Sequence, residues 1–310
     1  MNPEFSSKHF TLKKVRDGVY ATIAKEGSGS VANAGFVDLG DQVIIFDTFN
    51  TQQASDDLRY CAEKIINRPV TLVVNSHWHG DHIRGNQTFK DCAIISSQMT
   101  FSKMKDIHPK RINKQKKDIR GISAYRQSLE NQLHQSDGDK LKHQINSLIE
   151  LEQSLPTLEL VLPNQLYYKE ITFYGPKRSA KLFTFGGGHS QCDSVLYLPS
   201  DKVAFMGDLL FVNCHPTFFQ ESNPEKWIEI LKKIERMDIE VAVPGHGSLG
   251  TKKDILTLMN YISHLISKTR KDNNKEEVVM PTIYNEWTSP EIYQENSKII
   301  KEWLILNSKQ

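Results

Sequence analysis

Four side chains that can bind a metal lie within six residues of this chain. His77, His79, Asp81 and His82 form the pattern H-x-H-x-D-H. In an extended segment residues i and i+2 point to the same side, so His77 and His79 can share one ion. Asp81 and His82 follow where the chain must turn, within reach of a neighbouring ion. One such histidine alone would suggest a surface turn, but four ligands this close favour a metal site. Imidazole with carboxylate suits Zn²⁺, Fe or Mn²⁺ better than Ca²⁺ or Mg²⁺.

Three later residues meet the same chemical requirement, each beside glycine near the end of an expected strand. His189 lies in GGGHS (186–190), Asp208 in MGD (206–208) and His246 in PGHG (244–247). Five histidines and two aspartates suit two adjacent cations with one bridging carboxylate. Such a pair lowers the pKa of a shared water from 15.7 towards about 7, which predicts hydrolysis. We expect Asp81 to orient this nucleophile or to shuttle a proton.

The motifs of this chain, taken in order, resemble those of one known family. H-x-H-x-D-H (77–82), GGHSQCD (187–193), GDLLF (207–211) and PGHG (244–247) occur in the order seen in metallo-β-lactamase-fold hydrolases, and residues 17–23 and 33–48 look like that family's first strands. The resemblance implies one domain over residues 1–310, an α/β four-layer αβ/βα sandwich with a dinuclear site at one sheet edge. It places His77, His79 and His189 on the first metal. It places Asp81, His82 and His246 on the second, with Asp208 bridging.

The chain also departs from parts of that family. Class B β-lactamases usually lack a bridging aspartate like Asp208, and many use a cysteine ligand, whose position neither Cys192 nor Cys214 matches. Lactonases of this fold often carry a tyrosine soon after the bridging aspartate, where this chain has Leu209-Leu210-Phe211. We interpret Asp193 as a carboxylate that orders the His189 loop. Asp47 is interpreted either as a partner of the ligands or as a strand-end cap.

The surrounding pattern alternates short strands with helices. An apolar run at 71–75 predicts a strand buried on both faces, directly before the first ligand motif. Ligands on loops at strand ends are the usual way in which a rigid sheet presents a site. Other expected strands are 19–24, 35–39, 42–47, 158–162, 171–173, 181–185, 195–198, 202–206 and 241–243, and expected helices are 51–67, 224–237, 252–270 and 290–306, the last two within a C-terminal region of about 252–308.

Residues of about 100–156 interrupt the β pattern and predict a helical insertion. Leu141, Ile145, Leu148, Leu151 and Leu155 recur at helical spacing, and SDGD (136–139) predicts a turn with Asp139 as cap. The insertion can serve as a lid, a dimer surface or part of the core. Its basic run at 103–120 is interpreted as a solvated helix face, with contact to nucleic acid or an anionic substrate as the alternative.

Composition excludes several classes of protein. The 39 Lys and Arg against 37 Asp and Glu give a net charge of +2, which argues against a dedicated nucleic-acid binder. No apolar run is long enough for a membrane helix, and no apolar signal segment is visible at the start. Four scattered cysteines fit a reducing compartment, so a cytoplasmic protein is expected.

We therefore predict a hydrolase that uses two divalent ions, Zn²⁺ first and Fe or Mn as alternatives. Its expected substrate is a small molecule with an ester, thioester, lactone or amide bond, a β-lactam included. One alternative is a metallo-nuclease or phosphodiesterase on the same fold, motivated by the basic run. Others are an iron-dependent thiol oxygenase and a metal-binding module without catalysis. Five rings (Trp78, Phe211, His215, Phe218 and Phe219) are expected to pack beneath the site or to line its mouth.

Overall fold

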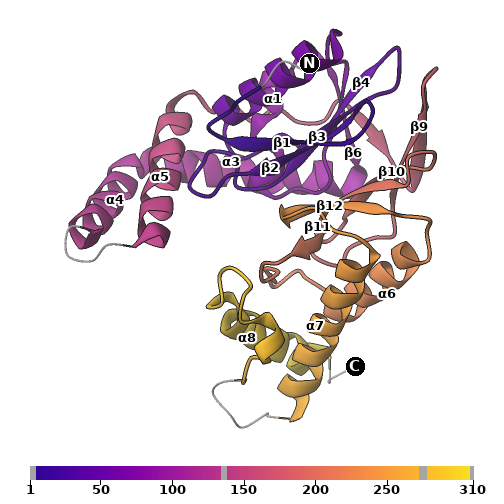
Figure 1. Cartoon of the computed structure of the whole chain (residues 1–310). Helices are drawn as coiled ribbons and strands as arrows, with labels where there is room; N and C mark the ends of the chain where they lie inside the picture. The colour runs from indigo at the N-terminus through magenta and orange to yellow at the C-terminus, as the bar shows by residue number, and fades with distance from the viewer. Residues whose placement is uncertain (1–4, 134–137, 272–277, 308–310) are drawn as a thin grey trace. The chain divides into compact units, whose positions relative to one another are not determined.

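The computed structural model describes residues 5–133, 138–271 and 278–307. The chain divides into two compact units (Figure 1): unit 1 is Met1–Tyr168 with Tyr174–Arg178, and unit 2 is Lys169–Phe173 with Ser179–Gln310. Each unit combines one mixed β-sheet with helices, which gives the α/β class that the sequence predicts.

The sheet of unit 1 changes from antiparallel to parallel along its width. Strands β1 to β4 pair antiparallel in chain order, and β4 to β7 pair parallel. The predicted strands at 19–24, 35–39, 42–47 and 71–75 are confirmed to within two residues at each end. The bounds are β1 (Phe10–Arg16), β2 (Val19–Ala24), β3 (Ala34–Asp38), β4 (Val43–Phe46), β5 (Leu72–Val74), β6 (Ala93–Ser97) and β7 (Gln165–Tyr167).

Helix α1 (Gln52–Ile66) packs its apolar side on this sheet. Thr51 caps its start by accepting from the Ala54 amide, and Asn67 ends it in the left-handed conformation. Leu58 and Ala62 are fully buried in one cluster with the strand residues Ile45 and Val73, among others. Burial of an aliphatic side chain of this size contributes about 1.5–3 kcal/mol, so α1 is anchored by its packing more than by its propensity.

Parallel pairing determines where the first ligand motif lies. Strands β4 and β5 run in the same direction, so their carboxyl ends meet at one edge of the sheet. Asp47 directly follows β4, and the segment from Asn75 follows β5 at the same edge. The chain then forms α2 (Gly80–Ile83) and the 3₁₀ helix η1 (Arg84–Phe89).

The predicted insertion is helical. It contains α3 (Gln98–Lys117), α4 (Ile119–Leu133), α5 (Asp139–Ser154) and the 3₁₀ turn η2 (Leu155–Thr157), and α4 packs against α5 (Figure 1). Residues 136 and 137 of the predicted turn lie outside the described residues. The predicted cap is wrong, because Gly138 is the N-cap and Asp139 is the first residue of α5.

The strand predicted at 158–162 is absent from unit 1, whose described residues there adopt no regular structure. Leu158 is buried with Ile112 of α3 and Leu155, and Leu160 packs against this cluster. These apolar side chains therefore reflect burial beneath α3 and not pairing in the sheet.

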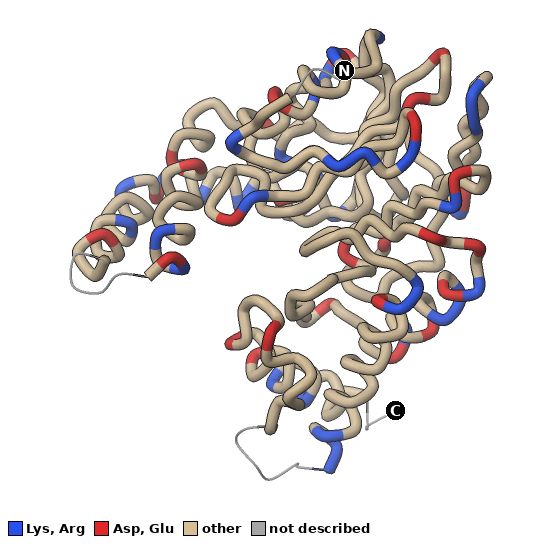
Figure 2. The backbone as a smooth tube through the Cα atoms, viewed as in Figure 1, with Lys and Arg blue, Asp and Glu red and all other residues tan. Residues whose placement is uncertain are grey.

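The basic run of α3 is mostly exposed. Lys105, Lys110, Arg111, Lys114 and Lys117 all face solvent. On α4 and α5 both signs of charge are interspersed (Figure 2), as in the pairs that Arg126 makes with Glu130 and Glu152. Among the described residues of the insertion, α4 and α5 thus present a mixed surface, whereas α3 carries a basic face.

Unit 2 contains a five-stranded sheet in the order β12-β11-β10-β9-β8. Two predicted strands are longer than expected, because β11 continues past Met206 through Asp208 to Val212, and β12 includes His246. Register shifts on both sides of Gly207, whose φ is +50°, let the strand continue through this irregular stretch. The bounds are β8 (Glu170–Tyr174), β9 (Ser179–Thr184), β10 (Ser194–Leu198), β11 (Val203–Val212) and β12 (Val241–Gly247).

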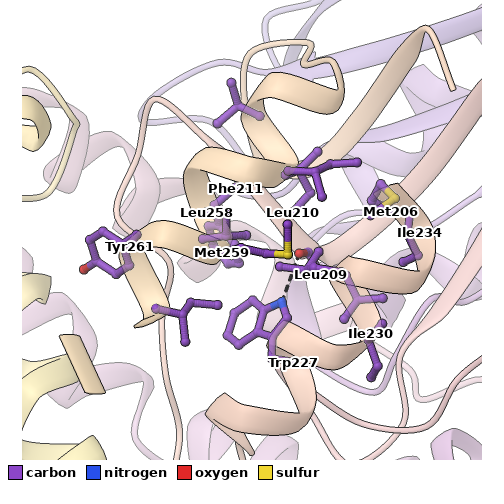
Figure 3. Packing of buried hydrophobic residues seen from close by; sticks show 14 of the residues in the cluster. Met206, Leu209, Leu210, Phe211, Trp227, Ile230, Ile234, Leu258, Met259 and Tyr261 are labelled. Carbon is purple, nitrogen blue, oxygen red and sulfur yellow. Dashed lines mark hydrogen bonds between the residues drawn. The ribbon is translucent and has the colours of Figure 1, made fainter. Parts of the chain in front are cut away.

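The helices of unit 2 are α6 (Pro224–Glu235), α7 (Lys252–Lys271), η3 (Thr282–Tyr284) and α8 (Ile292–Asn307), close to the predictions. Trp227 and Ile230 of α6 pack with Leu258 of α7 and with β11 (Figure 3), and the Trp227 Nε1 donates to the Leu209 carbonyl at 3.0 Å. Across the part of the chain that the structure describes, we find no helix whose length and apolarity would let it cross a membrane.

Candidate metal-binding site

Unit 1 gathers the four residues of the H-x-H-x-D-H motif. The His77 ring centroid lies 4.6 Å from that of His79 and 4.3 Å from that of His82. His79 has the extended backbone of a helix N-cap, and α2 then turns so that the His82 amide donates to the His79 carbonyl at 3.1 Å. His77 and His82 are fully buried, whereas Asp81 keeps 23% of its side chain exposed. Asp81 is therefore the residue of this cluster best able to meet solvent.

Asp47 holds two of these histidines through one buried carboxylate. It accepts from the Ser76 amide and hydroxyl, both at 2.7 Å, and its Oδ2 lies 2.7 Å from His82 Nδ1. Because the Ser76 hydroxyl donates to Asp47, it accepts from His77 Nδ1 at 2.9 Å. Burial raises the pKa of Asp47, and its contacts with His82 and Ser76 oppose that shift. Asp47 thus orients His82 directly and His77 through Ser76, which is the first of its two predicted roles.

Unit 2 gathers the other three predicted ligands. Asp208 Oδ2 lies 3.1 Å from His189 Nε2, and its other oxygen, Oδ1, lies 3.5 Å from His246 Nε2. Each oxygen of one buried carboxylate therefore faces a different imidazole. A carboxylate that bridges two metal ions through its two oxygens would have this arrangement. The His246 ring stacks on Phe211, with centroids 5.2 Å apart and planes 12° apart, which fixes its orientation.

Glycine at position 245 makes room for Asp208. A Cβ there would lie 1.9 Å from Asp208 Oδ1, so only glycine permits this approach. Asp208 lies inside β11, and the prediction that it follows the strand is wrong. Strand β12 pairs in parallel with β11 and brings His246 opposite Phe211, which lies three residues after Asp208.

Asp193 orders the loop that carries His189. It accepts from the amides of Gly188, His189 and Ser190, at 2.8 to 3.1 Å for the shortest contact of each. The predicted loop-ordering role is confirmed. The His189 ring also meets the Trp227 ring edge to face at 5.4 Å, so the loop is fixed from both sides.

The residues of the H-x-H-x-D-H motif offer donor atoms of the kinds that divalent metal ions bind. Because Nδ1 of His77 and of His82 is engaged in a hydrogen bond, Nε2 is the nitrogen of each ring that would coordinate a metal ion, the usual arrangement in which a second group orients the imidazole. His77 and His79 each offer a ligand atom within 4.8 Å of the other, and so do Asp81 and His82. Neither Cys192 nor Cys214 belongs to these groups, and burial raises the pKa of Cys214 to about 12, which disfavours a thiolate ligand.

The predicted aromatic residues mostly serve packing. Trp78, Phe211, His215 and Phe218 are buried. Phe219 is 38% exposed, and its ring meets His189 edge to face at 5.6 Å. Of these five rings, Phe219 alone is exposed, and it lies beside the predicted ligand His189.

Sequence reasoning assigned no role to Ser76, Arg84 or His108. Ser76 links Asp47 to His77, and His108 Nε2 lies 2.6 Å from the Trp78 carbonyl. Ser76 lies directly before the motif, which is a usable signal. His108 is a single histidine in a basic helix, 30 residues after Trp78, and its sequence context gave no such signal.

The sheets, the clusters of predicted ligands and their order along the chain define an α/β protein with a candidate metal site. A family model for the metallo-β-lactamase superfamily matches residues 27–246, which span all seven predicted ligands. The chain belongs to this superfamily.

Individual relatives are distant. The chain is 22% identical over 276 residues to the metallo-β-lactamase type 2 of Bacteroides fragilis, covering 86% of this chain and 90% of the relative. A metallo-β-lactamase structure from Pontibacter korlensis matches with a TM-score of 0.58 at 16% identity, over 82% of this chain and 99% of the other. The DIM-1 metallo-β-lactamase matches with a TM-score of 0.58 at 15% identity, over 83% and 98%. These likenesses confirm the predicted metallo-β-lactamase fold.

Proposed function

We propose that the two ligand clusters together hold two divalent metal ions, with zinc as the first candidate, and that the protein is a hydrolase. His77, His79 and His189 would hold the first ion, and Asp81, His82 and His246 the second. Asp208 would bridge them. The observation that carries this proposal is the pair of contacts from the two oxygens of Asp208 to different histidines. The family model, which runs through both clusters, supports their joint use.

The chemistry follows from the residues that surround the ions. When bound, two such cations supply an acidified water as nucleophile and polarise the bond that it attacks. Asp81 combines a carboxylate with partial exposure, so it would orient the attacking water and carry a proton to the leaving group. Asp47 keeps His82 in the tautomer that presents Nε2. No nucleophilic side chain is required.

We propose a small-molecule ester, thioester, lactone or amide as the substrate. The relative from Bacteroides fragilis is named a metallo-β-lactamase, which makes a β-lactam one member of the test panel. Asp208 and the absence of a matching cysteine ligand favour the wider group of hydrolases over β-lactamases alone.

Metal content of the purified chain, followed by a substrate panel, tests this proposal. We expect about two zinc ions per chain and hydrolysis of at least one ester, thioester, lactone or β-lactam. Asp208→Asn preserves the side-chain shape but removes the bridging charge. It should reduce bound metal to about one ion per chain and abolish turnover. Asp238→Asn, at an exposed aspartate paired with Lys202, is the matched control.

Two results would overturn the proposal: full activity in a preparation stripped of metal, or unchanged metal content in Asp208→Asn. Iron as the sole tightly bound metal, with thiol oxidation, would favour the oxygenase alternative. The exposed lysines of α3 motivate one further arm, a phosphodiester substrate assayed over a salt series. Phosphodiester cleavage that weakens steeply with salt would favour the nuclease alternative.

A further inference from the structure

One face of α3 contacts the metal-binding turn of unit 1 at several points. Met104, His108, Arg111 and Gln115 follow one another at spacings of four, three and four, so they share a single helix face. Met104 is fully buried in a cluster with Trp78 and Ile83, which flank the ligands His79 and His82. The insertion therefore begins with a helix that is packed on the turn.

His108 contacts the backbone between two ligands. Its Nε2 lies 2.6 Å from the carbonyl of Trp78, the residue between His77 and His79. A carbonyl only accepts, so this nitrogen donates. Both groups are buried, so the contact is shielded from water.

Arg111 adds a second contact to the same residue. Its guanidinium lies 5.0 Å from the centroid of the Trp78 ring, within the range of a cation–π interaction. The tryptophan is thus held by its carbonyl, through His108, and by its ring, through Arg111.

Arg84 ties the far end of the turn to the same helix face. Its Nη2 donates to Gln115 Oε1 at 2.7 Å, and its Nη1 donates to Asn50 Oδ1 at 3.4 Å. The side chain is buried and covers Gly80, where a Cβ would lie 2.9 Å from Arg84 Nε. Both ends of the ligand-bearing segment are consequently held by residues on one face of α3.

We propose that α3 is a fixed positioning element for the metal site, in which His108 sets the spacing of His77 and His79 through the Trp78 carbonyl. Arg84 and Gln115 fix the end of the turn that follows His82. This role rests on the proposed metal site. It excludes a mobile lid for α3, although α4 and α5 are left without this constraint.

The test measures zinc affinity of the full chain by competition with a chromogenic chelator. His108→Leu fills similar space but cannot donate to Trp78, so we expect zinc to bind about 10- to 100-fold more weakly. His108→Gln retains an N–H donor and should restore affinity to within a few fold. Ile112→Ala is the matched control, because Ile112 of α3 packs with Leu155 and Leu158 in a cluster that includes no residue of the ligand-bearing turn. It should lower stability and leave zinc affinity unchanged.

Gln115→Leu provides a second measurement should His108→Leu fail to fold, since Gln115 is only partly buried. It removes the acceptor of Arg84 and should weaken zinc binding several fold. Unchanged affinity in whichever of these two variants folds, beside tight binding by the unsubstituted chain, overturns the positioning role alone. Loss of affinity in Ile112→Ala equal to that in His108→Leu also overturns it, because a general loss of packing would then explain both. Absence of zinc binding by the unsubstituted chain would instead overturn the metal site itself.

Discussion

Replacing Asp47 by asparagine should separate metal binding from folding. The carboxylate receives two hydrogen bonds from Ser76 and one from His82 Nδ1, and it has no exposed surface. An asparagine can keep one acceptor towards Ser76, but its amide NH₂ then faces His82 Nδ1. Two donors cannot bond, so His82 must move its proton to Nε2, the nitrogen that would coordinate the metal.

The size of the effect follows from the contact that is lost. A hydrogen bond to a charged group contributes about 1.5–3 kcal/mol. At 1.4 kcal/mol per factor of ten, zinc affinity should fall roughly 10- to 150-fold. The metal-free protein should lose little stability, because removing a buried charge also removes its desolvation cost. We therefore expect an unchanged or slightly raised midpoint of urea unfolding in the presence of a chelator.

Isothermal titration with zinc and urea unfolding of the metal-free chain give the two required quantities. Asp57→Asn is a suitable control, since Asp57 bonds Ser7 at 2.5 Å in the same unit and contacts no predicted ligand. Zinc affinity within twofold of the unsubstituted chain would refute the tautomer argument. Collapse of the metal-free fold would show that Asp47 is mainly a structural residue.

Three further predictions concern single residues. Gly245→Ala places a methyl group against Asp208 and should remove about one metal ion per chain, measured by elemental analysis. Trp227→Phe loses the bond to the Leu209 carbonyl and should lower the free energy of unfolding by about 1–3 kcal/mol in urea. Burial lowers the pKa of His108 from 6.5 to about 4, so the unfolded chain binds this proton first as the pH falls. As the pH falls from 6.5 to 4, the free energy of unfolding of the metal-free protein should therefore decrease by at most about 3 kcal/mol. The decrease should be smaller in His108→Gln, and urea unfolding over this pH range measures both.

The sequence was sufficient for features that depend on local spacing. The motif at 77–82 and the apolar run at 71–75 predict a turn with four metal-capable side chains after a buried strand, and unit 1 contains that strand and turn. Alternating short strands and helices predict the α/β class. Glycines beside His189 and His246 marked positions of close backbone approach.

Sequence alone could not give the strand ends in unit 2 or the path of residues 158–162. Asp208 continues β11 because pairing with β12 resumes beyond Gly207, and that pairing is a contact between distant segments. Leu158 is buried beneath α3 without entering the sheet, since hydrophobicity signals burial and not the partner that provides it.

Residue types and their spacing thus determined which metal-binding groups this chain offers, because imidazole and carboxylate keep their metal preferences wherever they lie. Tertiary structure alone decided which side chains contact and orient these predicted ligands. Asp47 reaches His82 across 35 residues, and His108 reaches Trp78 across 30. Such contacts arise only when parallel strands and a packed helix bring distant segments together, and no local pattern in the sequence records them.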